Sequence, residues 1–315
     1  MSQAFPERVC VLGGTGLLGA EVASQFRDAG STVTIVARHP FAPGRAVEGC
    51  EAMEGDAANA ELLTEVLEQV DHVVYAIGSS NPGESNLDPP ADVARTLPPF
   101  LQLLESLRRR PGPRLTFFSS GGTVYGEPSH LPVPEEMRCH PITSYGVTKL
   151  CAEHYIGMYR HLYGVRSSIL RVSNAYGSRQ RAERGQGAIG AFLNAVRAGE
   201  TIRIFGDGSV VRDYVHVGDV ARATVALARL GSPPCLVNVG SGTGHSLVEV
   251  LDIVRSVTGL DPEVRFEKPR SFDVHSIVLD VSRLASLVDW HPRTLEEGVA
   301  LVWELSERRW EVSGR

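Results

Sequence analysis

A short apolar run that leads into closely spaced glycines constrains the fold of this chain more than any other feature. Val9–Leu12 is followed at once by Gly13, Gly16 and Gly19, and a helical pattern runs over residues 17–29. This Gly-x-x-Gly-x-x-Gly spacing allows a tight strand-to-helix turn and a close backbone approach to a pyrophosphate at the helix N-terminus. A plain turn is the alternative, but the surrounding strand–helix alternation favours dinucleotide binding. The expected cofactor contacts are Gly13, Gly16, Leu17, Leu18 and Gly19.

Strand-like and helix-like segments alternate through the first half of the chain. Runs typical of strands occupy residues 33–37, 52–54, 72–76, 114–118 and 168–172, and helical patterns occupy 60–68, 91–109 and 144–163. Alternation on this scale predicts an α/β fold with a parallel sheet and helices on both faces. Beyond about Ala175 the pattern loosens into short elements, with helices expected at 188–198 and 247–258. We expect residues 1–175 to bind the dinucleotide and residues 176–315 mainly to form a smaller substrate lobe, with some segments returning to the first domain.

Composition excludes several other classes of protein. The formal net charge is −6, which argues against nucleic acid or an anionic membrane as the main partner. No 18-residue apolar stretch and no signal peptide occur, so neither a membrane span nor secretion is expected. The five cysteines are scattered, without metal-ligand spacing or a disulfide framework. The sequence therefore predicts a cytoplasmic protein without a metal site.

The end of the second predicted strand bears on the choice of cofactor. An acidic residue there would hold the ribose hydroxyls of NAD, but Ala37 is followed by Arg38. An arginine at this point can hold the 2′-phosphate of NADP, or it can simply face solvent. Asp56, after the third predicted strand, is a candidate partner for the adenine amino group, with a surface turn as the alternative.

Tyr145 and Lys149 form a candidate catalytic pair. They lie four residues apart at the start of the predicted helix 144–163, so both project from one face. A lysine beside a phenol, with a positively charged nicotinamide nearby, favours the phenolate and lowers the pKa of the tyrosine. Such a tyrosine can serve as acid or base for a hydroxyl/ketone pair.

Together with the glycine loop, this pair and several motifs resemble a known family. The motifs are Ser119-Ser-Gly-Gly-Thr123-Val-Tyr-Gly126, Arg171-Val-Ser-Asn174-Ala-Tyr-Gly177, Ile204-Phe-Gly-Asp-Gly208, Arg212-Asp-Tyr-Val-His-Val217, Asn238-Val-Gly-Ser-Gly242 and Arg270-Ser-Phe-Asp273. Over nearly its whole length the chain resembles the extended short-chain dehydrogenase/reductase superfamily. Within that superfamily it is similar to the nucleotide-sugar epimerase/dehydratase branch typified by UDP-galactose 4-epimerase.

The resemblance implies a Rossmann-type doubly wound sheet, a nucleotide diphosphate sugar as substrate and NAD as cofactor, with NADP the alternative because of Arg38. Tyr145 would be the catalytic acid/base, and Lys149 would hold the nicotinamide ribose. Asn174, Arg212 and Arg270 would contact the diphosphate of the substrate, with Asp273 near the nucleoside ribose. A homodimer is also implied through the helix that carries an apolar stripe at Leu97, Phe100, Leu101, Leu104 and Leu107, although this stripe could equally be core.

The chain departs from the family pattern at one catalytic position. Aligned on Val124-Tyr125-Gly126, the usual serine or threonine falls on Gly121, which has no hydroxyl. Thr123 or Ser120 could replace it. The Asp-Glu pair that dehydratases carry just before this motif is replaced by Gly122-Thr123, so dehydration of the usual kind is not expected.

Three functions remain open from the sequence. The leading one is a nucleotide-sugar 4-epimerase, with a UDP-hexose as the expected substrate, that works through a transient 4-keto sugar and unchanged bound NAD. An NAD(P)H-dependent 4-ketoreductase would use the same residues for one half-reaction. A non-catalytic dinucleotide-binding protein would not need Tyr145 and Lys149.

Overall fold

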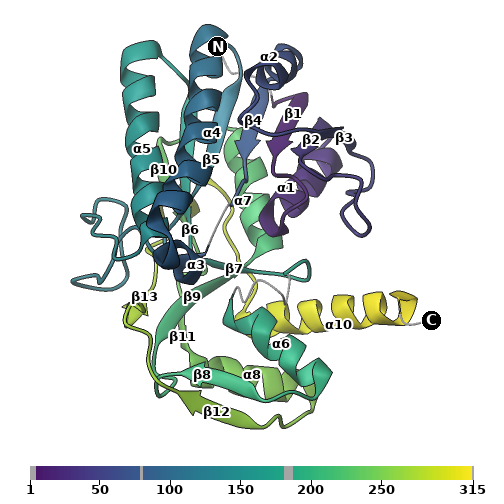
Figure 1. Ribbon diagram of the computed structural model, residues 1–315, viewed down its shortest axis with the longest axis vertical. Coiled ribbons are helices and arrows are strands. Elements are labelled where there is room, and N and C mark those ends of the chain that lie inside the picture. Colours follow the sequence, from purple (N-terminus) through teal and green to yellow (C-terminus); the bar gives the residue numbers. More distant parts are fainter. Residues whose placement is uncertain (1–4, 79–80, 181–186, 314–315) are drawn as a thin grey trace.

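A seven-stranded parallel sheet forms the centre of the molecule (Figure 1). The computed structural model describes residues 5–78, 81–180 and 187–313. The strand order is β10-β6-β5-β4-β1-β2-β3, and each neighbouring pair is parallel. The chain winds outward from β1 in both directions, so the carboxyl ends of β1 and β4 flank the point where the winding reverses. The strands are β1 (Arg8–Leu12), β2 (Thr32–Ala37), β3 (Glu51–Glu54), β4 (His72–Tyr75), β5 (Arg114–Ser120), β6 (Ser167–Val172) and β10 (Leu236–Val239).

Both faces of this sheet are covered by helices because side chains alternate along each strand. In β1, Val9 and Val11 join one buried cluster, with residues of α1 (Leu17–Asp28) and α7 (Val217–Ala228). Cys10 and Leu12 join the cluster on the other face. Residues of α2 (Ala60–Gln69), α4 (Pro89–Arg109) and α5 (Ser144–Tyr163) complete that second cluster. The α/β fold with a doubly wound parallel sheet is therefore confirmed.

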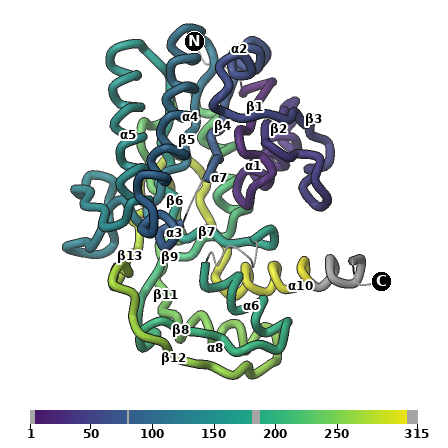
Figure 2. Tube along the Cα trace, viewed as in Figure 1, coloured from purple at the N-terminus to yellow at the C-terminus, as the bar shows by residue number. Residues whose placement is uncertain are grey.

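A smaller layer lies at the carboxyl-terminal end of the sheet (Figures 1 and 2). Strand β9 (Val211–His216) is its hub, paired with β7 (Asn174–Tyr176), β11 (Gly244–Ser246) and β13 (Ser276–Ile277). Its own core holds Phe192, Ile204, Val250 and Val299. This layer also contains β8 (Ile202–Phe205), paired with β12 (Val264–Glu267), and the helices α6 (Ala188–Ala198), α8 (Leu247–Thr258) and α10 (Leu295–Ser313). Helix α9 (Ser282–Leu287) packs against β10 of the large sheet.

The later half of the chain contributes to both layers. Strand β10 extends the large sheet beside β6, and α7 packs against α1. Arg114, at the start of β5, holds the C-terminal end of α7 by donating to the carbonyl oxygens of Ala228 and Leu230.

The apolar stripe of α4 is core rather than surface. Phe100, Leu104 and Leu107 are at most 2% exposed, and Leu97 and Leu101 pack against the same cluster. The stripe is therefore the core-facing side of α4, which was one of the two readings that the sequence left open. Within the described part of the chain, no helix is long and apolar enough to span a membrane.

Candidate active site

The glycine loop forms the tight turn that the sequence predicted. Gly13 has φ +82°, and a Cβ on Gly14 would come within 2.7 Å of Ile35. A Cβ on Gly19 would lie 2.4 Å from the carbonyl oxygen of Gly13, so glycine is required where the helix closes on the loop. The need for Gly14 follows from packing against β2, which the glycine spacing alone does not reveal.

The N-terminus of α1 offers free donors to a phosphate. The first backbone hydrogen bond of the helix runs from Ala20 N to Gly16 O, and Gly16 has no capping side chain. In the described residues, no protein acceptor faces the N–H groups of Leu17, Leu18 and Gly19. These donors and the positive end of the helix dipole fit the pyrophosphate of a dinucleotide.

The two residues expected near the adenosine lie on the surface beyond β2 and β3. Arg38 is exposed directly after β2. Asp56 is also exposed, and its carboxylate accepts a hydrogen bond from Ala58 N at 2.9 Å, closing the turn before α2. Both follow strands at the same sheet edge as the glycine loop.

A short helix that the sequence did not predict, α3 (Pro82–Leu87), holds the N-terminus of α5. The N–H of Ser144 donates to Asn86 Oδ1 at 2.9 Å, and the N–H of Tyr145 donates to Ser85 Oγ at 3.1 Å. Thr143 caps the next donor, Gly146 N, at 3.1 Å. Three donors of the first turn are therefore satisfied by side chains, and two of these come from α3.

Tyr145 and Lys149 face each other on α5, as the spacing predicted. Lys149 Nζ lies 5.7 Å from the centre of the Tyr145 ring and donates to the carbonyl oxygen of Phe118 at 2.8 Å. Burial raises the pKa of Tyr145 to about 12, and burial lowers the pKa of Lys149 to about 8. The protein's own groups thus favour the protonated phenol, whereas the lowered tyrosine pKa was expected with a positively charged nicotinamide nearby.

A buried carboxylate on α4 also affects the pKa values of these two side chains. Asp92 is 3% exposed and accepts hydrogen bonds from Ser144 Oγ at 2.8 Å and from Thr148 Oγ1 at 3.2 Å. Its negative charge raises the pKa values of both Tyr145 and Lys149. Sequence reasoning missed Asp92 because no motif connects it with residues more than 50 positions away.

An ion pair one turn farther along α5 joins this helix to β6, and a hydrogen bond to the same carboxylate joins it to β5. Arg171 on β6 donates to both oxygens of Glu153, at 3.0 Å from Nε to Oε1 and 2.6 Å from Nη2 to Oε2. Ser119 on β5 donates to Glu153 as well, at 2.5 Å. Because Ser119 precedes Ser120, this pair sets the distance between Ser120 and the face of α5 that carries Tyr145.

The hydroxyl groups beside Gly121 differ in their surroundings. The polar Ser120 side chain lowers the pKa of the Tyr145 phenol, against the larger effect of burial. Thr123 Oγ1 is buried, and the described residues give it no hydrogen-bond partner. A Cβ on Gly121 would lie 2.6 Å from Leu279 Cδ1, so Leu279 fills the space of the missing side chain.

Arg212, Arg270 and Asp273 come together although they lie on distant segments. Arg270 grips both oxygens of Asp273, at 2.8 Å and 3.2 Å, and Arg212 Nη2 lies 4.0 Å from Asp273 Oδ1. Asn174 lies on β7 beside β9 and donates to Asp213 O at 3.3 Å. Sequence reasoning missed Phe205 and Phe272, whose rings flank the Arg270 guanidinium at 4.7 Å and 5.4 Å.

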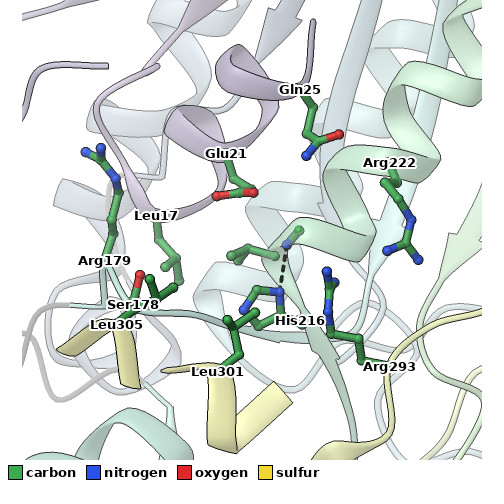
Figure 3. A pocket seen from close by; sticks show the side chains of 12 residues that line it. Leu17, Glu21, Gln25, Ser178, Arg179, His216, Arg222, Arg293, Leu301 and Leu305 are labelled. Atoms are coloured by element: carbon green, nitrogen blue, oxygen red, sulfur yellow. Dashed lines mark hydrogen bonds between the residues drawn. The ribbon is translucent and has the colours of Figure 1, made fainter. Parts of the chain in front are cut away.

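A separate pocket of about 120 Å³ lies between α1, α7 and α10 (Figure 3). The Leu17 side chain lines this pocket, so the pocket does not occupy the backbone N–H of Leu17 that we expect to bind a dinucleotide. His216 also lines it and accepts a hydrogen bond from Gly218 N at 3.0 Å, so it caps α7. Burial lowers the pKa of His216 to about 4, so its ring is neutral near pH 7.

Across the described residues, no group of His, Cys, Asp and Glu side chains could hold a metal ion.

Comparison with known proteins gives matches over nearly the whole chain. Residues 9–240 match the NAD dependent epimerase/dehydratase family. A putative UDP-glucose 4-epimerase of Methanocaldococcus jannaschii is 33% identical over 297 residues, which cover 93% of this chain and 96% of that protein. A UDP-glucose 4-epimerase from Thermotoga maritima, solved with UDP-glucose, has a TM-score of 0.89 at 29% identity and covers 96% of this chain and 99% of its own. The UDP-glucose 4-epimerase of Thermus thermophilus, solved in complex with NAD, has a TM-score of 0.87 at 32% identity, covering 95% and 99%.

Restoring a serine by the substitution Gly121→Ser should destabilise the protein. Its Cβ would collide with Leu279, which is fully buried, and overpacking of this kind costs about 1–3 kcal/mol. In a Leu279→Ala background only the 3.1 Å approach to the carbonyl oxygen of Arg171 remains, so the same substitution should then cost less. The measurement is denaturant unfolding of the four proteins in a double-mutant cycle. An equal loss in both backgrounds would show that Leu279 does not exclude a side chain at position 121.

Proposed function

This chain belongs to the NAD dependent epimerase/dehydratase family, and we propose that it is a nucleotide-sugar 4-epimerase acting on a UDP-hexose. The observation that carries the proposal is the Tyr145 phenol, which faces Lys149 and whose pKa Ser120 lowers, beside a glycine loop of the dinucleotide-binding type. The full-length similarity to UDP-glucose 4-epimerases supports the same activity.

NAD fits the site through the free donors of Leu17, Leu18 and Gly19 and through Lys149, which would hold the nicotinamide ribose. When bound, NAD supplies the acceptor and donor for the hydride at C4 and a positive charge near Tyr145. We assign Gly13, Gly16 and Gly19 to the close approach of the pyrophosphate, and Asp56 to the adenine. Exposed Arg38 favours NADP, and together with the missing hydroxyl at Gly121 it supports a ketoreductase as the second candidate.

The chemistry that we assign to Tyr145 is proton transfer at the sugar 4-hydroxyl. Its raised pKa keeps the phenol protonated at neutral pH, so a proton can be returned to the 4-keto sugar at the end of the cycle. Removal of the substrate proton needs the phenolate, which the polar Ser120 side chain favours and a positive nicotinamide would stabilise further. Ser120 takes the place of the hydroxyl missing at Gly121.

The smaller layer, around β9, would hold the substrate. Arg212 is largely buried beside Asp273, and two guanidinium groups on one carboxylate leave donors for a diphosphate. We assign Arg212, Arg270 and Asn174 to the diphosphate and Asp273 to the nucleoside ribose. In this proposal residues 1–175 bind the cofactor and residues 176–315 mainly bind the sugar nucleotide.

Tyr145→Phe should lower kcat for the interconversion of UDP-glucose and UDP-galactose by at least about 10²-fold, because it removes the proton-transferring oxygen. Wild-type turnover should need no added cofactor and consume no NADPH. Tyr163→Phe, 42% exposed at the C-terminal end of the same helix, is the matched control and should be unimpaired. A fully active Tyr145→Phe enzyme would contradict the assignment, and stoichiometric NADPH consumption would favour the ketoreductase.

Ser120→Ala and Thr123→Val separate the two candidate hydroxyl groups. The Ser120 side chain lowers the pKa of Tyr145, so Ser120→Ala should lower kcat by about tenfold or more and shift the alkaline side of the kcat profile upward in pH. Thr123→Val removes a hydroxyl without a partner in the described protein and should change kcat less. The reverse order of effects would transfer the role to Thr123.

Arg212→Ala should weaken UDP-glucose binding by about 2–5 kcal/mol, because it truncates one partner of a buried charge pair. Arg212→Lys should recover only part of this loss, since an ammonium lacks the planar fork. Arg203→Ala, an exposed arginine on β8, is the control. Calorimetry on the NAD-loaded proteins measures the affinity, and equal values for wild type and both Arg212 variants would exclude Arg212 from the substrate site.

We also propose a homodimer formed through α5. Val147, Tyr155, Met158 and Leu162 are 37–58% exposed and lie within one helical face. Met158→Glu with Leu162→Glu should convert a dimer into a monomer in analytical ultracentrifugation, while Leu260→Glu, exposed after α8, should not. A wild-type protein that sediments as a monomer would refute this interface.

A cytoplasmic location remains our proposal as well. All five cysteines are free in the structure, which suits a reducing compartment.

A further inference from the structure

A second pocket lies at the opposite edge of the large sheet from the glycine loop. Its volume is about 250 Å³. Its lining comes from the first residues of β4, β5 and β6, from the last turns of α7 and from the loops that contain Gly164 and Pro233. The reaction site lies at the carboxyl ends of the same strands, so the two sites are separated by the length of the sheet.

The charged lining of this pocket is entirely positive. Arg114, Arg160 and Arg166 line it, and none of its lining residues is Asp or Glu. Arg114 is only 8% exposed, and the described part of the chain gives it no ion pair. A buried charge without a counter-ion is costly, and the two carbonyl oxygens that Arg114 contacts, at and just beyond the end of α7, offset this cost only in part.

Further polar groups in the lining are unsatisfied. His72 is 3% exposed and contacts Thr116 Oγ1 through Nε2 at 2.9 Å, while its Nδ1 has no partner in the described structure. Ser167 is 8% exposed, and its Oγ also has no hydrogen-bond partner in the described structure. Burial, with Arg114 and Arg166 nearby, lowers the pKa of His72 to about 3, so the ring adds no charge of its own near pH 7.

The arginines are held in place by the backbone. Arg160 donates to the carbonyl oxygen of Ser167, and Arg166 donates to that of Gly112. Between them the wall is apolar, with Leu115, Val165, Leu170 and Leu227. A fixed positive charge beside an apolar wall fits an oxyanion carried on a compact apolar body.

We propose that this pocket is a binding site for a compact organic anion, a carboxylate or a phosphate monoester, separate from the sugar-nucleotide site. Arg114 and Arg166 bind the oxyanion, and the apolar wall packs against the body of the ligand. About 250 Å³ is the space of roughly eight water molecules, which matches a single ring with one anionic group. This inference does not depend on the proposed epimerase activity.

The test is calorimetric titration of the full-length, NAD-loaded protein with benzoate and with phenyl phosphate, with neutral benzamide as the matched probe. Saturable binding of one or both anions, with no binding of benzamide, supports the site and tells which oxyanion it takes. Equal binding of benzamide and benzoate contradicts it, because the charge would then contribute nothing. Inorganic phosphate that binds as tightly as phenyl phosphate also contradicts it, because the apolar wall would be unused.

Variants locate the binding. Arg166→Gln removes an exposed charge with little risk to folding and should weaken anion binding about fivefold. Arg265→Gln, on β12 and far from the pocket, should leave it unchanged. Arg212→Ala should also leave it unchanged, which excludes binding at the proposed diphosphate site. Loss of binding in Arg212→Ala, or unaltered binding in Arg166→Gln, would overturn the proposal.

Discussion

The ion pair between Glu153 and Arg171 is the interaction on which the geometry of the reaction site depends. Both side chains are 6% exposed, and the pair joins α5 to β6 while Ser119 ties β5 to the same carboxylate. Tyr145 and Lys149 lie two turns and one turn before Glu153 on α5, and Ser120 follows Ser119. A buried ion pair adds little stability over an apolar contact of the same volume, but its partners cannot move apart without leaving a charge unpaired. Its contribution is therefore to hold the reacting groups at fixed positions.

Hydrogen bonds at both ends of the first turn of α5 complete this arrangement. Asp92 holds Ser144 and Thr148 from α4, while Ser85 and Asn86 hold the N-terminal donors from α3. A Cβ on Gly83 of α3 would lie 3.9 Å from Phe272, so α3 also reaches the segment that carries Arg270 and Asp273. The helix with the catalytic pair and the proposed substrate site are thus connected through one short element.

Local patterns were enough to predict most of the fold, but the site was predicted only where a motif covers it. The helices over 144–163, 188–198 and 247–258 coincide with α5, α6 and α8, and the apolar period is strong in α6 and α8. The resemblance to the epimerase/dehydratase family is confirmed by the match over residues 9–240. Asp92, the role of α3 and the space filled by Leu279 depend on packing between distant segments, which no single-sequence pattern encodes. The apolar stripe of α4 had the right period but could not reveal which face of the helix is covered.

The central claim is that hydride leaves C4 of the sugar and returns to the same molecule inside one site. Incubation of the protein with UDP-glucose deuterated at C4, without added cofactor, tests it most directly, with the product analysed by mass spectrometry and NMR. The account predicts UDP-galactose that keeps its deuterium at C4, with no loss to water and no exchange with unlabelled sugar nucleotide in the same tube. Deuterium that is washed out, or a label that is shared between molecules, would contradict it.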